Sequence, residues 1–369
     1  MLAVLEPVAS RGSKGAACGA RPHRLLRAAG LALGLAATVS ACDSPPPAPV
    51  PEYESVRYLA PDSLLTEFPA EADLILERPF GLHASEAGIA VTDILAGRAY
   101  RFGWDGGLVA AAGRRGEGPG EMEMPLSVRL WQDSSLWTAD PRNRRINHYS
   151  GTGELLTVFP APQAGDQFLP LHVGAVLVPS SHGSLLSVLH PDGTFEAVSD
   201  SAAWPDELVR LQGAERSGLR QLMISGRSGE TVFLLHNVAD FSTWMFDLDL
   251  AGNRLVSASR VSLPEWFEIE SRRRLSEMQK KLDDDGQLLV PFNALHDPIP
   301  GTIWLMTGTL GRMIGAQLPL ESDGESIAVI ATNDEKRGLR DAVLFGDRLV
   351  TLYDTVVRVY SLKEVPASA

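Results

Sequence analysis

The sequence predicts an all-β fold, a six-bladed β-propeller, on two observations. Beyond residue 55, short runs rich in β-branched and aromatic residues alternate with turns of Gly, Asp, Asn and Pro, as in strands joined by hairpins. These runs also repeat, because Pro79, Pro125 and Pro170 each open a similar unit at spacings of 46 and 45 residues. A period of this length, with four strands in each unit, is typical of propeller blades.

Three further units complete the count of six. Gly218 and Gly338 open two similar segments that lie 120 residues apart, which leaves room for one more unit that begins near Gln287. The last unit has only three strands before the chain ends. We therefore expect Val56 to Leu59 to add its fourth strand, which would close the ring and remove an exposed sheet edge.

Four Asp-Gly pairs mark expected hairpin turns, since glycine adopts the positive φ that such turns need. They are Asp105-Gly106, Asp192-Gly193, Asp285-Gly286 and Asp323-Gly324.

One segment breaks the strand pattern. Residues 263–282, LPEWFEIESRRRLSEMQKKL, are rich in helix formers and predict a helical insertion between blades four and five. Phe267, Leu275, Met278 and Leu282 share one face of that helix. It would either cap one mouth of the central channel or pack on the rim for stability.

The first 41 residues predict a signal peptide. Three arginines (Arg21, Arg24 and Arg27) precede an apolar run from residue 28 to 39, which is shorter than the roughly 20 residues that a transmembrane helix needs. The run ends in Val39-Ser40-Ala41-Cys42, which resembles the lipobox of bacterial lipoproteins, in which the cysteine is lipidated, palmitate being one of the acyl groups expected. The alternative is an ordinary signal peptide cut after a small residue, with Cys42 incidental.

Residues 42–55 then form a proline-rich tether, DSPPPAPVPEYES after Cys42. Prolines favour a stiff polyproline-II spacer, which gives a reach of roughly 40 Å. The expected organisation is therefore a signal peptide (1–41), a lipidated cysteine with its tether (42–55) and a propeller (56–369). Such a protein would be exported to the cell envelope and held at a membrane by its lipid, facing the periplasm in a Gram-negative cell.

Composition excludes several classes of protein. The chain has 369 residues with 44% hydrophobic and 21% charged content, as in an ordinary folded protein with a large core. Its formal net charge is −13, and the 28 basic against 45 acidic residues after residue 41 leave −17, so nucleic acid is not an expected partner. The two cysteines, Cys18 and Cys42, both lie near the N-terminus, so the exported domain is not stabilised by disulfides.

The second unit carries a family resemblance. Residues 113–156, from GRRGEGPGE to SGTGELL, resemble an NHL-type repeat of the TolB-like six-bladed propellers, in particular those of bacterial lipoproteins. Asp140, Asn143, Arg145 and Ile146 match that family's D-x-x-N-x-R-I turn. The resemblance implies that the aspartate and the arginine hold the turn together. It is weaker elsewhere, since Thr92-Asp93-Ile94 in the first unit has the aspartate of this motif but not its asparagine.

Several possible chemical sites are better explained as structure. The glycine-rich loop from Gly113 to Glu121 lacks the following helix that a phosphate loop needs, so we interpret it as a connection between blades. Arg142, Arg144 and Arg145 form a small basic cluster that either holds this turn or binds an anion or partner. Three further motifs lack the spacing or the structural context that a zinc site, a calcium loop or a serine nucleophile needs. They are the three histidines His172, His182 and His190, the acidic run from Asp283 to Gly286, and Gly226-Arg227-Ser228-Gly229. No metal or cofactor site is predicted.

A ligand site, where present, is expected at the channel mouth, where the innermost strands converge. The alignment of the units brings to it His83, Arg129, His172, Arg220, Arg340 and Asp341. A shift of one residue would reverse each of these orientations.

Two functions remain open, because a propeller fold by itself assigns no chemistry. The first is a binding or scaffolding module for a protein or small-molecule ligand, without catalytic residues. The alternative is a propeller hydrolase or oxidoreductase of the lactonase or sugar-dehydrogenase type, with an axial metal or cofactor. The first is preferred, because the expected inner strands offer mainly His and Arg and not the Glu, Asn and Asp that such calcium sites use. A third variant is an envelope sensor or a partner of a transport system.

Overall fold

The computed structural model describes residues 56–69, 74–131, 133–161, 167–171, 174–179, 185–198, 222–226, 232–237, 242–263, 265–269, 272–273, 276, 292–296, 302–309, 312–319, 326–332 and 338–365. All of them belong to one compact unit, Pro49–Ala369. The predicted signal peptide and the predicted tether lie outside the described residues.

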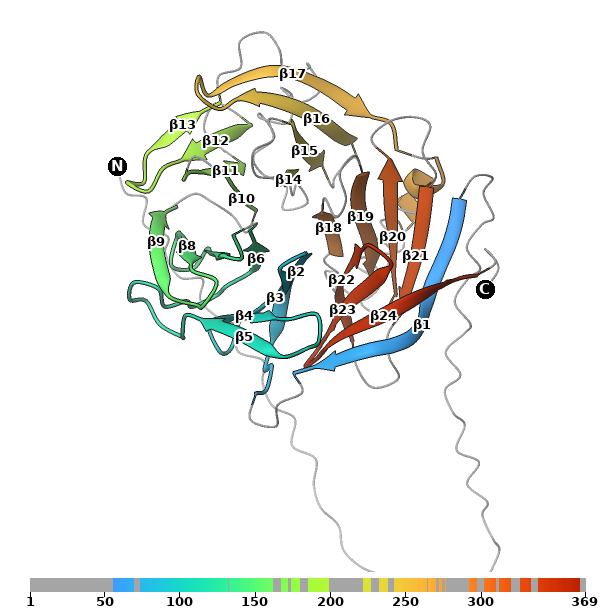
Figure 1. Ribbon diagram of the computed structural model, residues 1–369. Coiled ribbons are helices and arrows are strands. Elements are labelled where there is room, and N and C mark those ends of the chain that lie inside the picture. Colours follow the sequence, from blue (N-terminus) through green and yellow to red (C-terminus); the bar gives the residue numbers. More distant parts are fainter. Residues whose placement is uncertain are drawn as a thin grey trace, which may run out of the picture. The chain divides into compact units, whose positions relative to one another are not determined.

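The described strands form a β-propeller, in which the sheets surround a common centre (Figure 1). Four sheets consist of four consecutive antiparallel strands each. The first sheet consists of β2 (Pro79–Ser85), β3 (Gly88–Asp93), β4 (Arg98–Phe102) and β5 (Leu108–Ala112). The second consists of β6 (Ser127–Leu130), β7 (Leu136–Asp140), β8 (Arg145–Tyr149) and β9 (Leu155–Pro160). The third sheet consists of β10 (Leu169–Pro170), β11 (Val176–Pro179), β12 (Leu186–Leu189) and β13 (Phe195–Ala197). The fourth consists of β14 (Leu222–Gly226), β15 (Val232–Asn237), β16 (Ser242–Asp249) and β17 (Arg254–Val261). The all-β prediction is confirmed.

The fifth sheet has eight strands, because β1 joins two groups of strands that are far apart in the chain. On one side of β1 (Val56–Phe68) lie β18 (Phe292–His296), β19 (Thr302–Thr309), β20 (Arg312–Pro319) and β21 (Ser326–Thr332). On its other side lie β24 (Val357–Glu364), β23 (Arg348–Tyr353) and β22 (Leu339–Phe345).

The N-terminal strand closes the ring as expected, but not with the expected residues. Leu59 to Phe68 pair antiparallel with β24, whereas Val56 to Leu59 pair parallel with Ser326 to Val329 of β21. The prediction that Val56 to Leu59 complete the last unit is therefore wrong except for Leu59. The strand is 13 residues long, which is enough to reach both neighbours, and this length was not visible in the short apolar run VRYL.

The strands nearest the centre are β2, β6, β10, β14, β18 and β22, and we call them the first strands (Figure 1). Neighbouring first strands touch: β2 contacts β6 and β22, β14 contacts β10 and β18, and β18 contacts β22. At Gly81 on β2 the approach is so close that a Cβ atom would lie 2.9 Å from the carbonyl oxygen of Leu126. Glycine is required there by the neighbouring sheet.

At two places, the hairpin turn before the outer strand of one sheet contacts the outer strand of the neighbouring blade. The hairpin turn before β5 contacts the end of β1, since a Cβ on Gly106 would lie 2.7 Å from Thr66 Cγ2. Gly193, in the turn before β13, contacts Pro160 at the end of β9 in the same way. Gly106 and Gly193 have φ of 86° and 85°, as predicted for Asp-Gly turns; Gly286 and Gly324 lie outside the described residues.

The predicted insertion between β17 and β18 contains helical residues. Residues 265–269, 272–273 and 276 are helical, and Phe267 is buried, with its ring 5.6 Å from that of Trp266 in an edge arrangement. Leu275, Met278 and Leu282 lie outside the residues whose side chains are described. The full extent of the helix stays a prediction.

A buried carboxylate holds the entrance of the first sheet. Asp93, at the end of β3, accepts four backbone N–H bonds: Oδ2 from Glu77 (2.6 Å), and Oδ1 from Arg78 (3.1 Å), Leu95 (3.0 Å) and Ala96 (3.1 Å). It is fully buried. The side chain thus ties the segment that enters β2 to the turn between β3 and β4. We call this arrangement the carboxylate clasp.

The clasp recurs in two other sheets. Asp140, at the end of β7, accepts the backbone N–H groups of Glu123 and Met124 at 2.9 Å each. Asp354, directly after β23, accepts that of Gly338 at 3.2 Å, at the entrance of β22. In each case an acid that follows the second strand positions the first strand of the same sheet.

Removing the clasp is expected to destabilise the propeller. Asp93→Ala leaves four partly buried backbone N–H groups without this acceptor, which should cost about 3 kcal/mol and lower the melting temperature by roughly 5–10 °C. The matched control is Asp105→Ala, since Asp105 is exposed and accepts only the N–H of Gly107 at 3.1 Å. Melting followed by circular dichroism tests this, and equal melting temperatures for the two variants would contradict it.

Candidate functional site

Three ionisable side chains occupy the first strands of neighbouring sheets. His83 lies on β2, Arg129 on β6 and Asp341 on β22, and β2 contacts both other strands. All three are partly exposed, whereas the residues that flank His83 and Arg129 along their strands are buried. This alternation distinguishes the ionisable side chains from the core positions beside them.

His83 connects the first two sheets. Its Nδ1 atom accepts a hydrogen bond of 3.3 Å from the backbone N–H of Leu130 on β6. A ring nitrogen that accepts carries no proton, so the neutral histidine has its proton on Nε2. The polar tip of the ring therefore remains a donor.

Burial changes the acid–base properties of the other two groups. Burial lowers the pKa of Arg129 to about 10, so its guanidinium still carries a positive charge at pH 7. Burial raises the pKa of Asp341 to about 7, although the N–H of Ala342 donates to Asp341 Oδ1 at 2.8 Å and opposes the shift. The site thus combines a fixed cation with a carboxyl group that is partly protonated at neutral pH.

Of the other residues expected at the channel mouth, the structure describes Arg340 alone. Arg340 belongs to the clasp of β22, because its Nε and Nη2 atoms lie 2.8 and 2.7 Å from Asp354 Oδ1. A β-bulge in β22 falls at this point, between Leu339 and Asp341. His172 and Arg220 lie outside the described residues.

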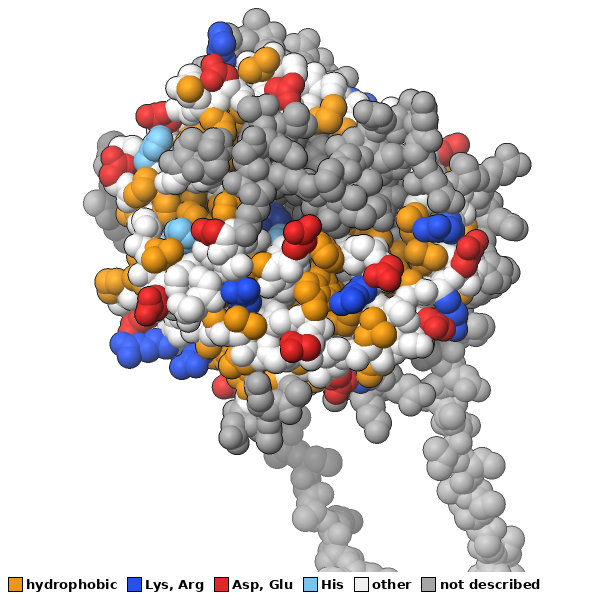
Figure 2. All heavy atoms as spheres, in the orientation of Figure 1, with side chains coloured by type: hydrophobic (Ala, Val, Ile, Leu, Met, Phe, Trp, Pro, Cys, Tyr) orange, Lys and Arg blue, Asp and Glu red, His pale blue; other side chains and the backbone are white. Residues whose placement is uncertain are grey.

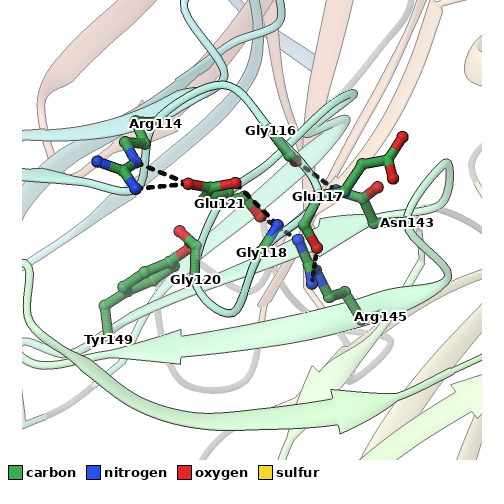
Figure 3. Close-up of polar contacts among 9 residues, drawn as sticks. All are labelled: Arg114, Gly116, Glu117, Gly118, Gly120, Glu121, Asn143, Arg145 and Tyr149. Carbon is green, nitrogen blue, oxygen red and sulfur yellow. Dashed lines mark hydrogen bonds and ion pairs between the residues drawn. The ribbon is translucent and has the colours of Figure 1, made fainter.

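The glycine-rich loop between β5 and β6 is held by side chains from several directions (Figure 3). Within it, Arg114 Nε donates to Glu121 Oε1 at 2.8 Å, and the N–H of Gly118 donates to Glu121 Oε2 at 2.8 Å. The Gly118 N–H and the Arg114 guanidinium lower the pKa of Glu121. The carboxylate therefore folds the loop onto itself.

Sheet β6–β9 supplies the remaining anchors of this loop (Figure 3). Asn143 Nδ2 donates to the carbonyl of Gly116 at 2.8 Å, and Arg145 donates to those of Glu117 (3.0 Å) and Glu121 (2.5 Å). Tyr149 donates its hydroxyl to the carbonyl of Gly120 at 2.9 Å. The interpretation of this loop as a connection between sheets agrees with these contacts, and so does the tying role that the resemblance implied for Asp140 and Arg145.

Of the three histidines that cluster in the sequence, the structure describes His190 alone. His190 lies in the turn before β13, with Nε2 3.5 Å from Glu196 Oε2, while His172 and His182 lie outside the described residues. Within the described ranges, no three His, Cys, Asp or Glu side chains gather closely enough to hold a metal ion. In that same part of the chain, no helix has the length and apolar character that a bilayer crossing requires.

Charged side chains of both signs are interspersed with apolar ones on the face that Figure 2 shows.

The sequence analysis missed the structural roles of Asp354 and of Tyr149, and it gave no weight to the exposed Arg98 and Arg115. The signal for Asp354 was present, because an acid directly follows the second strand of its unit just as Asp93 ends β3.

No family model and no curated protein matches this chain. Some solved structures have a similar backbone path, at low sequence identity to this chain. A candidate exported protein from Bacteroides fragilis has 11% identity and a TM-score of 0.49, over 83% of this chain and 99% of that one.

Two enzymes are among the similar structures. Virginiamycin B lyase from Staphylococcus aureus has 10% identity and a TM-score of 0.44, over 80% of this chain and 98% of that one. A gluconolactonase from Xanthomonas campestris has 12% identity and a TM-score of 0.43, over 77% of this chain and 86% of that one. At this level of similarity their activities are not carried over to this chain.

The raised pKa of Asp341 predicts a pH effect on stability. The folded protein keeps a proton on Asp341 up to a pKa of about 7, whereas an unfolded chain loses it near a pKa of about 3.9. Ionisation of this group therefore lowers stability as the pH rises through that window. Asp341→Asn should match the wild type at pH 4 and be more stable at pH 8.

Urea unfolding of both proteins at the two pH values measures this difference. The control is Asp347→Asn, a change of an acid that is almost fully exposed. An Asp341→Asn protein that is less stable than the wild type at pH 8 would show that the carboxylate is stabilised when charged.

Proposed function

We propose that this chain is an exported lipoprotein, anchored to a membrane through Cys42, whose six-bladed β-propeller binds a ligand where its first strands converge. The observation that carries the binding role is the placement of His83, Arg129 and Asp341 on three first strands, of which β2 contacts both β6 and β22. Ionisable groups whose pKa values are changed by burial are concentrated at functional sites of proteins.

The count of six blades is supported by the strand order. Four blades are the four-stranded sheets, and β18–β21 form a fifth. The sixth consists of β22, β23 and β24 with β1 as the outer strand, which also pairs with β21 and so joins two blades into one sheet. The proposed domains are the signal peptide (1–41), the lipidated cysteine with its tether (42–55) and the propeller (56–369).

Membership in the NHL-type, TolB-like group is proposed on the contacts of one turn. Asp140 accepts two backbone N–H groups and the Nδ2 of Asn143 at 2.7 Å, and Arg145 donates to two loop carbonyls. These are the roles that the resemblance of the sequence assigns to the turn.

The chemistry of the site favours a ligand with an acidic group. Arg129 offers a charged, partly desolvated guanidinium, which binds carboxylates and phosphates strongly. His83 offers an Nε2–H donor, and the partly protonated Asp341 can exchange hydrogen bonds with hydroxyl or amide groups. A hydroxylated acid, free or as part of a larger partner, would use all three groups.

Ligand binding can be tested by thermal shift with glucuronate, citrate and inorganic phosphate as probes. A probe at 100 times its dissociation constant should add about 2.7 kcal/mol and raise the melting temperature by roughly 5 °C. Arg129→Gln should abolish the shift, and Arg254→Gln, a change of an exposed arginine on β17, should preserve it. A shift that survives Arg129→Gln would place the binding elsewhere.

The lipid anchor has a separate test. Cys42→Ser removes the thiol that accepts the acyl chain, so the variant should leave the membrane fraction of a bacterial host for the soluble fraction. Metabolic labelling with palmitate, followed by fractionation, measures both effects. A wild-type protein that takes up no label, or label that persists in the Cys42→Ser protein, would reject lipidation at this cysteine.

A further inference from the structure

A second surface lies at the end of the first two sheets where β2 and β6 begin. It consists of residues 74–78, 94–98, 113–124 and 141–145, and we call it the arginine surface. Because neighbouring strands are antiparallel, the entrances of first strands and the turns between second and third strands share one end of a sheet. The segments also touch: the N–H of Ile94 donates to the carbonyl of Arg78 at 3.0 Å, and Arg115 Nη1 to that of Leu95 at 3.3 Å.

This surface is basic in an acidic protein. It contains seven arginines and four glutamates, a formal net charge of +3, whereas the chain after residue 41 carries 28 basic and 45 acidic residues. Figure 2 shows a group of blue side chains at the lower left edge, where Figure 1 places the loop between β5 and β6. Two glutamates are already paired, Glu121 with Arg114 at 2.7 Å and Glu123 with Arg142 at 2.8 Å.

Arg144 is placed on this surface at a cost in backbone energy. Its φ is +55°, in the left-handed region where glycine and asparagine are favoured, and its side chain is exposed. The fold needs only the backbone of this residue, since its N–H donates to Pro141 and its carbonyl accepts from Ala161. An arginine in a position that suits a smaller residue better indicates that the side chain serves another purpose.

Apolar side chains lie beside the arginines. Ile75 is 67% exposed and Leu95 is 41% exposed, in two segments joined through the clasp of Asp93. Exposed aliphatic groups next to cations are the combination that interfacial membrane binding uses: the apolar groups enter the headgroup region, and the cations pair with anionic lipids.

We propose that the arginine surface docks the propeller onto a bilayer that contains anionic phospholipids. The proposal rests on the lipid anchor of the proposed function, because the tether keeps the domain within roughly 40 Å of a membrane. The rest of the chain after residue 41 contains 21 basic against 41 acidic residues, so a bilayer of this kind attracts the arginine surface and repels the protein as a whole. The anchor supplies proximity, and the arginines supply a defined face.

The test uses the chain from residue 43 onward, which lacks the acyl group and contains the whole compact unit Pro49–Ala369. Co-sedimentation is measured with vesicles of phosphatidylcholine alone and of an equal mixture with phosphatidylglycerol, at low and high salt. The variants are Arg115→Gln, Arg144→Asn and Leu95→Ser, with Arg254→Gln as the control. Circular dichroism verifies that each variant is folded.

We expect binding to the mixed vesicles only, and less of it at high salt. Each of the two arginine variants should bind about fivefold more weakly, in keeping with the contribution of one cation near an anionic surface. Leu95→Ser should also bind more weakly, and Arg254→Gln should bind like the wild type. Arg144→Asn should leave the melting temperature unchanged or raise it, which a structural role for this arginine would not allow.

Three results would overturn the proposal: no binding of the wild type to mixed vesicles, variants that bind as it does, or an equal loss in Arg254→Gln. The first of these would direct attention to an acidic protein as the partner of this surface. Because the assay contains no acyl chain and no ligand of the first strands, its failure is distinguishable from failure of the Cys42 and Arg129 experiments.

Discussion

The arrangement of this propeller depends on buried carboxylates that position the first strands of its sheets. Asp93 and Asp140 are fully buried, and each is satisfied by backbone N–H groups that the sheet itself leaves unpaired where the chain enters the first strand. A buried charge is tolerated only with such partners. The end of the second strand must therefore lie beside the segment that enters the first strand. This fixes how the two strands are aligned with each other.

The position of the first strands has consequences for the centre of the molecule. Strand β2 contacts both β6 and β22, so residues that are remote in the chain become neighbours. The contact of His83 with the backbone of Leu130 and the close approach at Gly81 both require this placement. Burial on these strands lowers the pKa of Arg129 and raises the pKa of Asp341.

The two surfaces discussed above differ in how they are built. The side chains of the first strands project from rigid sheets, whereas the arginine surface is formed by turns and by a loop. Side chains nevertheless hold that loop in place. Its polar backbone groups form hydrogen bonds with Glu121, Asn143, Arg145 and Tyr149. Burial raises the pKa of the Tyr149 phenol, so it remains a hydrogen-bond donor throughout the neutral range. Arg144 and Arg115 can then be presented from a fixed backbone.

The sequence by itself determined what depends on neighbours along the chain. The period of the units, the Asp-Gly turns at Gly106 and Gly193, and the strands that carry His83, Arg129 and Asp341 follow from local patterns, because hairpin geometry and strand alternation are properties of short segments. The match of Asp140, Asn143 and Arg145 to a known turn likewise anticipated the contacts that hold the loop.

Only the tertiary structure decided what depends on contacts between sheets. The pairing of Val56 to Leu59 with β21, the partnership of Arg340 with Asp354 and the pKa of Asp341 each involve segments that meet through folding. Strand alternation is a period of two, so a single bulge such as that in β22 reverses which side chains share a face. No local pattern contains that information, because it is set by the packing of one sheet against the next.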